Sequence, residues 1–101
     1  MVGRMKSAKT MNLLTSTQSA IAEECDAIKK MLLEKNLAYG NSAIDPVRIF
    51  SKASAEEQIL VRIDDKISRL ARGEVAGEDV FLDLLGYIVL LRVARKFASE
   101  G

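Results

Sequence analysis

Apolar residues recur at helical spacing in three stretches of the chain. In the first stretch, hydroxyl residues at positions 15–17 offer an N-cap, and the pattern predicts a helix to about Asn36. Its apolar stripe has one member per turn: Ile21, Cys25, Ile28 and Leu32. We interpret Cys25, the single cysteine, as a small core residue of this stripe rather than as a nucleophile.

The second stretch has the best-defined ends. Ser54 and Glu57 form an S-x-x-E capping box, and Gly73 after Arg72 is a typical C-terminal stop. The apolar face of this predicted helix holds Ile59, Leu60, Ile63, Ile67, Leu70 and Ala71. The other face holds Arg62, Asp65, Arg69 and Arg72. The pattern therefore predicts one amphipathic helix over residues 54–72.

The third stretch is apolar on nearly every side. Acidic residues Glu78 and Asp79 favour a helix start there, and the helix is predicted to run to about Phe97. It is too short and too interrupted by charge for a membrane span, which needs about 20 mostly apolar residues. Two other helices can hardly cover all its sides, so we expect the remaining apolar surface to meet a second subunit of a homo-oligomer.

A long connection joins the first two helices. It reads "NLAYGNSAIDPVRIFSKA" over residues 36–53, with turn formers at 40–42 and Pro46 favouring an extended backbone at Asp45. Its apolar residues Ile44, Val47, Ile49 and Phe50 predict that it packs against the helices. A connection of this length in a compact domain indicates either a functional segment or an error in the assigned helices, and we favour the functional segment.

Composition narrows the fold and the chemistry. The chain is 49% hydrophobic and 5% aromatic with one proline, which favours an all-α fold. Its 15 basic and 14 acidic residues give a net charge of +1, so bulk attraction to nucleic acid is not expected. With no histidine and one cysteine, soft zinc sites are excluded, and any metal site must be oxygen-ligated and suited to magnesium or manganese. Residues 1–14 are basic without a signal-peptide core, so we predict a flexible N-terminal arm on a cytoplasmic protein, followed by one domain over 15–101.

Asp83 lies inside the apolar third helix and needs a partner. An ionised carboxylate in apolar surroundings costs several kcal/mol unless a cation, hydrogen bonds or a metal compensate it. One interpretation is a structural pair with Tyr87 or with an arginine of the second helix. The other is a metal or nucleotide site, to which Asp79, one turn earlier on the same face, would contribute. Asp65 offers a similar choice, since it could simply bridge Arg62 and Arg69.

Three segments together resemble a known family. They are "KNLAYGNSAIDPVRIF" (35–50), "RIDDKISRLARG" (62–73) and "GEDVFLDLLGYIVLLR" (77–92). They resemble the nucleotide-modification-associated domain 1 family of bacteriophages, which is related to the all-α, MazG-type nucleoside triphosphate pyrophosphohydrolases. The resemblance spans about residues 28–95, most of the chain. It implies a MazG-like helical fold with an acidic cleft near a subunit interface, in an infected bacterial cell if a phage encodes it.

The resemblance also implies roles for particular residues. Catalysis would rest on Asp65 and Asp83, and a Mg²⁺ or Mn²⁺ ion bridging the nucleotide phosphates would bind Asp65, Asp79, Asp83 and Glu78. Nucleotide contacts would come from Lys35, Tyr39, Asn41, Ser42, Arg62, Lys66 and Arg69. The sequence departs from the hydrolases, which carry E-x-x-E and E-x-x-D pairs: here the second helix has Asp64 and Asp65, and the third has Asp79 and Asp83. The set of four carboxylates is incomplete.

Two functions of different classes follow. The first is an enzyme that acts on a nucleoside phosphate with magnesium-dependent, pyrophosphohydrolase-like chemistry in nucleotide metabolism or modification. The second is a catalytically inactive protein that binds and sequesters a nucleotide signal. A structural helical oligomer is a third possibility. Contacts from Arg62, Arg69 and Arg72 to DNA are a minor alternative, because aromatic residues do not alternate with them.

Overall fold

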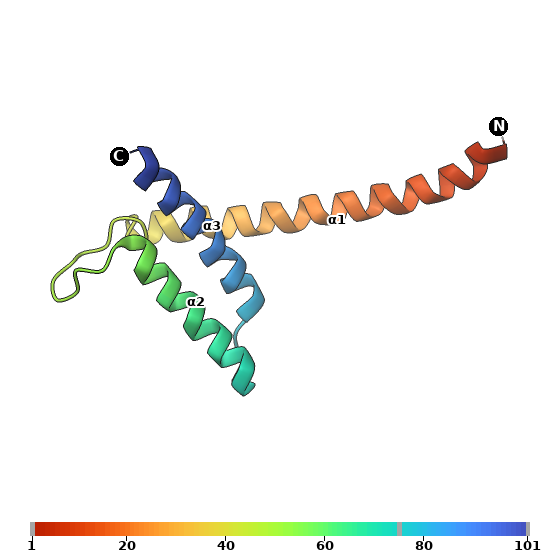
Figure 1. Cartoon of the computed structure of the whole chain (residues 1–101). Helices are drawn as coiled ribbons and strands as arrows, with labels where there is room; N and C mark the ends of the chain where they lie inside the picture. Colours follow the sequence, from red (N-terminus) through yellow and green to blue (C-terminus); the bar gives the residue numbers. More distant parts are fainter. Residues whose placement is uncertain (1, 75, 101) are drawn as a thin grey trace. The chain divides into compact units, whose positions relative to one another are not determined.

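The chain is all-helical over the residues that the computed structural model describes, which are 2–74 and 76–100, with side chains described from residue 15 onward (Figure 1). The helices of this part are α1 (Val2–Tyr39), α2 (Ala55–Arg72) and α3 (Val80–Glu100). The prediction of an all-α chain with three main helices is confirmed for these residues. The chain divides into two compact units, residues 1–31 and residues 32–101.

Helix α1 is longer than the sequence pattern predicts. The expected start at residues 15–17 is wrong, because the helix begins at Val2. Residues 2–14 contain methionine, lysine, alanine and leucine and no proline, so helix propensity outweighs the hydroxyl residues that follow. The flexibility expected of residues 1–14 stays a prediction.

The apolar stripe of α1 is not a core in this chain. Ile21 is 58% exposed, Cys25 is exposed and Ile28 is half-buried. Within the first unit, which is a single helix over its described residues, there is no second element against which to bury a stripe. The prediction that Cys25 is a core residue is therefore wrong for the isolated chain.

Helix α2 begins and ends where its sequence predicts. The Ser54 hydroxyl accepts a hydrogen bond of 3.1 Å from the backbone N–H of Glu57, which is the N-cap interaction. At the other end Gly73 is left-handed, with φ 72°. The Gly73 and Glu74 N–H groups donate to the carbonyls of Leu70 and Arg69, at 3.2 and 2.9 Å. This is the Schellman arrangement, and it fixes the point at which the chain turns back toward α3.

Helix α3 begins at Val80, capped by Asp79, whose Oδ1 accepts a 3.0 Å hydrogen bond from the Leu82 N–H. The predicted start is confirmed. The helix extends to Glu100, three residues past the predicted end. No helix in the described part of the chain combines the length and the apolarity that crossing a bilayer requires.

Helices α2 and α3 pack on each other and form a hairpin (Figure 1). Among the described side chains, the buried hydrophobic ones are Ile59 and Val80, each 2% exposed, and Ala94, 8% exposed. Gly86 is also buried, so a residue without a side chain lies on the packed part of α3. The apolar face of α2 is narrower than predicted, because Leu60 and Ile67 are 38% and 52% exposed. The hairpin thus leaves much apolar surface uncovered.

The connection between α1 and α2 packs less than predicted. Gly40 and Asn41 form a turn with φ 63° and 65°. Of the four apolar residues, only Ile44 lies against the helices, whereas Val47, Ile49 and Phe50 are 81%, 72% and 97% exposed. The Arg48 Nε donates to the Ala53 carbonyl at 3.1 Å, which closes the intervening residues into a loop extending from the start of α2 (Figure 1). The expectation that these apolar residues pack on the helices is wrong for all but Ile44.

Candidate functional site

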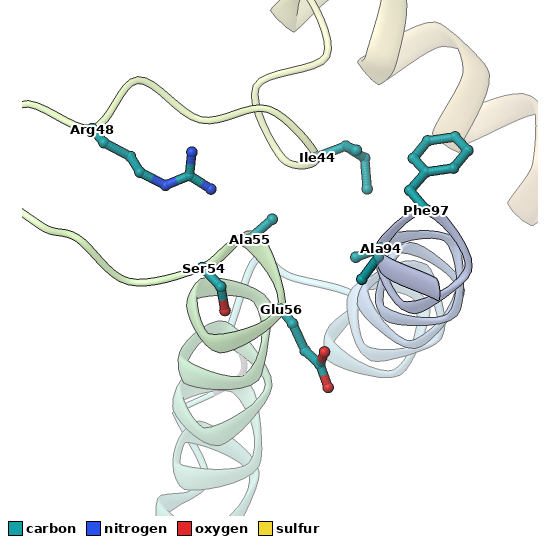
Figure 2. Close-up of a pocket in the computed structure, with 8 residues that line it drawn as sticks. Ile44, Arg48, Ser54, Ala55, Glu56, Ala94 and Phe97 are labelled. Carbon is teal, nitrogen blue, oxygen red and sulfur yellow. The ribbon is translucent and has the colours of Figure 1, made fainter. Parts of the chain in front are cut away.

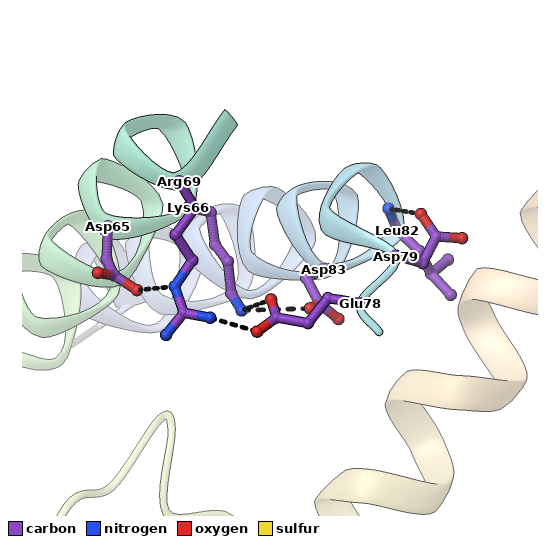
Figure 3. A network of polar contacts seen from close by, with 7 residues as sticks. All are labelled: Asp65, Lys66, Arg69, Glu78, Asp79, Leu82 and Asp83. Atoms are coloured by element: carbon purple, nitrogen blue, oxygen red, sulfur yellow. Dashed lines mark hydrogen bonds and ion pairs between the residues drawn. The ribbon is translucent and has the colours of Figure 1, made fainter. Parts of the chain in front are cut away.

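A polar cluster lies where α2 ends and α3 begins (Figure 3). Its members are Asp65, Lys66 and Arg69 of α2, Glu78 before α3, and Asp83 of α3. The Schellman turn at Gly73 and the cap at Asp79 bring these two segments together. Five residues that the resemblance singles out, two cations and three carboxylates, therefore form one network.

Lys66 is part of the packed face of α2. It follows Ile59 by seven residues and Ile63 by three, so it lies on the stripe that faces α3. Its side chain is 15% exposed, and its Nζ lies 3.3 Å from Oδ2 of Asp83, whose side chain is 25% exposed. Lys66 therefore compensates the carboxylate inside the apolar third helix. The expected structural partners, Tyr87 or an arginine, were the wrong residues, although the expected kind of pair is present.

Glu78 joins the two cations. It accepts a hydrogen bond of 3.0 Å from Nζ of Lys66 at its Oε2, and Nη1 of Arg69 donates to its Oε1 (Figure 3). Arg69 also lies 3.3 Å from Asp65, one turn earlier on α2. Of the two pairs expected for Asp65, the pair with Arg69 is present, whereas none with Arg62 is found among the described contacts. Three carboxylates share two cations in this cluster, which leaves one negative charge.

The ion pairs shift two pKa values. The hydrogen bond with Glu78 raises the pKa of Lys66 above 10.5, with a further contribution from Asp83 and an opposing one from partial burial. The hydrogen bond from Lys66 lowers the pKa of Glu78 below 4.5, and Arg69 adds to this effect. Both groups are therefore held in their charged forms at neutral pH.

The four carboxylates predicted as metal ligands turn to different partners. Among the described residues, no group of three or more histidine, cysteine, aspartate or glutamate side chains is placed to hold a metal ion. Asp79 faces the α3 backbone as its cap, and Asp65 turns to Arg69 (Figure 3). Glu78 and Asp83 do converge, but the point where they meet is occupied by the Lys66 ammonium group. The four predicted ligands thus do not gather at one point in the arrangement described, and binding of Mg²⁺ or Mn²⁺ stays a prediction.

The other predicted nucleotide contacts lie elsewhere. Arg62, Lys35, Tyr39 and Ser42 are exposed and outside the cluster, and Asn41 accepts a 2.9 Å hydrogen bond from the Asn36 amide. Ser42 is two residues from Ile44, which lines one cleft together with Glu56 at the start of α2. Lys66 is ten residues further along α2, about 15 Å at the rise of a helix. One chain therefore does not bring the connection and the cluster together.

A cleft of about 330 Å³ lies at the opposite end of the hairpin (Figure 2). Ile44 of the connection reaches toward Ala94 and Phe97 of α3, and Arg48 lies at the rim. Beside the cleft, Nε of Arg95 donates to the Glu56 carboxylate at 2.7 Å. This ion pair was not predicted, because a pair between two helices depends on their register, which the pattern of a single helix does not specify.

Comparison with known proteins adds no assignment. The chain matches no protein-family model, no curated protein and no solved structure. The resemblance to the MazG-type family and its phage relatives thus stays a prediction from the sequence.

Proposed function

We propose that this chain binds a nucleoside phosphate at the Lys66–Arg69 cluster and holds it without hydrolysing it. The observation that carries the proposal is the convergence of two cations, one turn apart on α2, on a single carboxylate group. A carboxylate presents two oxygens to its donors much as a phosphate does, so donors that hold one are placed to hold the other. Arginine adds the forked geometry that suits phosphate oxygens.

Binding without turnover is favoured over hydrolysis by the placement of the carboxylates. Pyrophosphohydrolase chemistry of the resembled kind requires acidic side chains that converge on a metal-bridged phosphate. In the described chain those side chains are engaged with lysine, arginine and a helix end. A binding role places no such demand on them.

A complete ligand site would include a second copy of the chain. The connection that carries the residues expected to hold the base and sugar meets α2 near Glu56, which is about 15 Å along the helix from Lys66. Large apolar side chains remain exposed on the hairpin, including Leu85 at 46% and Ile88 at 45% of α3. Assembly would cover this surface and bring one copy's connection toward another copy's cluster.

The test measures binding and turnover together. The full-length chain is titrated calorimetrically with a panel of ribo- and deoxyribonucleoside phosphates, with Mg²⁺ present, and the ligand is then analysed by mass spectrometry. We expect at least one nucleotide to bind and to be recovered intact. Lys66→Gln and Arg69→Gln should each weaken binding about tenfold, because a hydrogen bond to a charged group is lost.

Arg72→Gln is the matched control, because it removes the same charge from the same helix at a residue paired only with Glu74 among the contacts described. Its affinity should equal that of the wild type. Failure of every nucleotide to bind at millimolar concentration would refute the proposal. Release of pyrophosphate that Asp83→Asn abolishes would replace binding by the enzymatic function.

A further inference from the structure

Glu78 lies where an anionic ligand would have to bind. Its carboxylate accepts from Lys66 and from Arg69, the two cations to which the proposed function assigns phosphate contacts. Carboxylate and phosphate oxygens compete for the same donors. While Glu78 holds both cations, the cluster carries a net negative charge and repels an incoming anion.

We infer that Glu78 is an internal competitor of the ligand: its carboxylate stands in for a phosphate group in the free protein, and a phosphate binds by displacing it. This inference rests on the proposed function and adds a self-blocking contact that lowers the affinity of the site. Displacing Glu78 removes one negative charge from the cluster and frees a donor on each cation. Asp83 and Asp65 keep their pairs with Lys66 and Arg69 throughout.

The backbone explains why Glu78, rather than its neighbours, is the group that moves. Asp65 and Asp83 belong to helices, so their backbones are fixed by α2 and α3. Glu78 lies in the segment between the helices, directly after Gly77, which has φ 78° and open space where a side chain would be. Asp79 caps α3 independently of Glu78. The Glu78 side chain can therefore leave the cations without disturbing either helix.

The predicted signature is a gain of affinity on removal of an acidic residue. Glu78→Gln keeps the size of the side chain and weakens the acceptor that competes with the ligand. We expect Glu78→Gln to bind inorganic pyrophosphate about threefold more tightly than the wild type, since an exposed ion pair opposes binding by about this factor. The measurement is an NMR titration of the isotope-labelled full-length chain with inorganic pyrophosphate, following the amide signals of Gly73 and Gly77.

Two variants separate a local effect from a change in overall charge. Glu74→Gln alters the net charge equally and lies in the same segment, but Glu74 pairs with Arg72 at 3.4 Å and not with the cluster. Its affinity should stay at the wild-type value. Adding Arg69→Gln to Glu78→Gln should abolish the gain, because the freed donor is removed.

The outcomes distinguish the inference from the function beneath it. If the wild type binds pyrophosphate and Glu78→Gln binds no more tightly, Glu78 is not a competitor and the inference fails alone. If Arg69→Gln leaves the NMR signal changes caused by pyrophosphate unaltered in both the wild type and Glu78→Gln, the proposed phosphate site fails as well. Thermal unfolding checks that Glu78→Gln is folded. Should it not fold, Glu78→Asp, whose shorter side chain retreats from the cations, should still bind more tightly than the wild type, and an unchanged affinity there overturns the inference.

Discussion

The α2–α3 hairpin is held together in two different ways. Along most of its length it depends on buried apolar contacts around Ile59, Val80 and Ala94. Where the chain turns, it depends on the half-exposed network of Lys66, Glu78 and Asp83. The two regions contribute unequally to the free energy of unfolding. Burial of an apolar side chain contributes a few kcal/mol, whereas a solvent-exposed ion pair contributes little. The apolar region therefore supplies stability, and the polar region supplies a position for charged groups.

The largest expected loss of stability comes from a substitution in the apolar region. Ile59→Ala should lower the free energy of unfolding by about 3 kcal/mol, because it removes a buried side chain and leaves a cavity between the helices. Urea unfolding followed by circular dichroism measures this loss. Val61→Ala on the same helix is the control, since Val61 is 66% exposed and its loss should be nearly neutral. Equal effects of the two changes would contradict the assignment of the core.

A smaller effect is expected in the polar region. Lys66→Met should cost about 1 kcal/mol, because it leaves the Asp83 carboxylate half-buried without its cation. Adding Asp83→Leu should recover most of this loss, since an apolar pair of similar volume replaces the ion pair. The same urea experiment reports both values. A double variant less stable than Lys66→Met would mean that the network supplies stability after all.

The smallest effect is a dependence on pH. The lowered pKa of Glu78 means that its contribution to stability is complete above pH 4.5 and is lost as the pH falls through the folded-state pKa. The raised pKa of Lys66 means that its contribution is lost only as the pH rises beyond 10.5. We expect the difference in Tm between wild type and Glu78→Gln to be constant between these values and to shrink on acidification. A difference in Tm that grows as the pH falls would contradict the lowered pKa of Glu78.

The same contrast separates what the sequence could predict from what it could not. The ends of α2 and the start of α3 follow from Ser54, Gly73 and Asp79, whose effects are local to the backbone. The charge that Asp83 needs was also predictable, because an isolated carboxylate in an apolar helix requires compensation. These are consequences of short-range chemistry.

The partner of Asp83 required knowledge of the register between two helices. Lys66 carries one available signal, since it is a charged residue on the apolar stripe between Ile63 and Leu70. The prediction that the connection packs on the helices was wrong for another reason. Apolar residues such as Phe50 indicate packing only where a surface is present to receive them. The prediction that Cys25 of α1 is a core residue had the same weakness, since Cys25 is exposed.

The exposed Phe50 of the connection is a site at which a protease could separate the hairpin from α1. Phe50 is 97% exposed and lies in non-helical backbone, which is what chymotrypsin needs at its cleavage site. A brief digestion would release a fragment beginning at Ser51 that retains the capping serine, both packed helices and every residue of the charged network. Cleavage after Phe50 would thus define the fragment in which phosphate binding is measured.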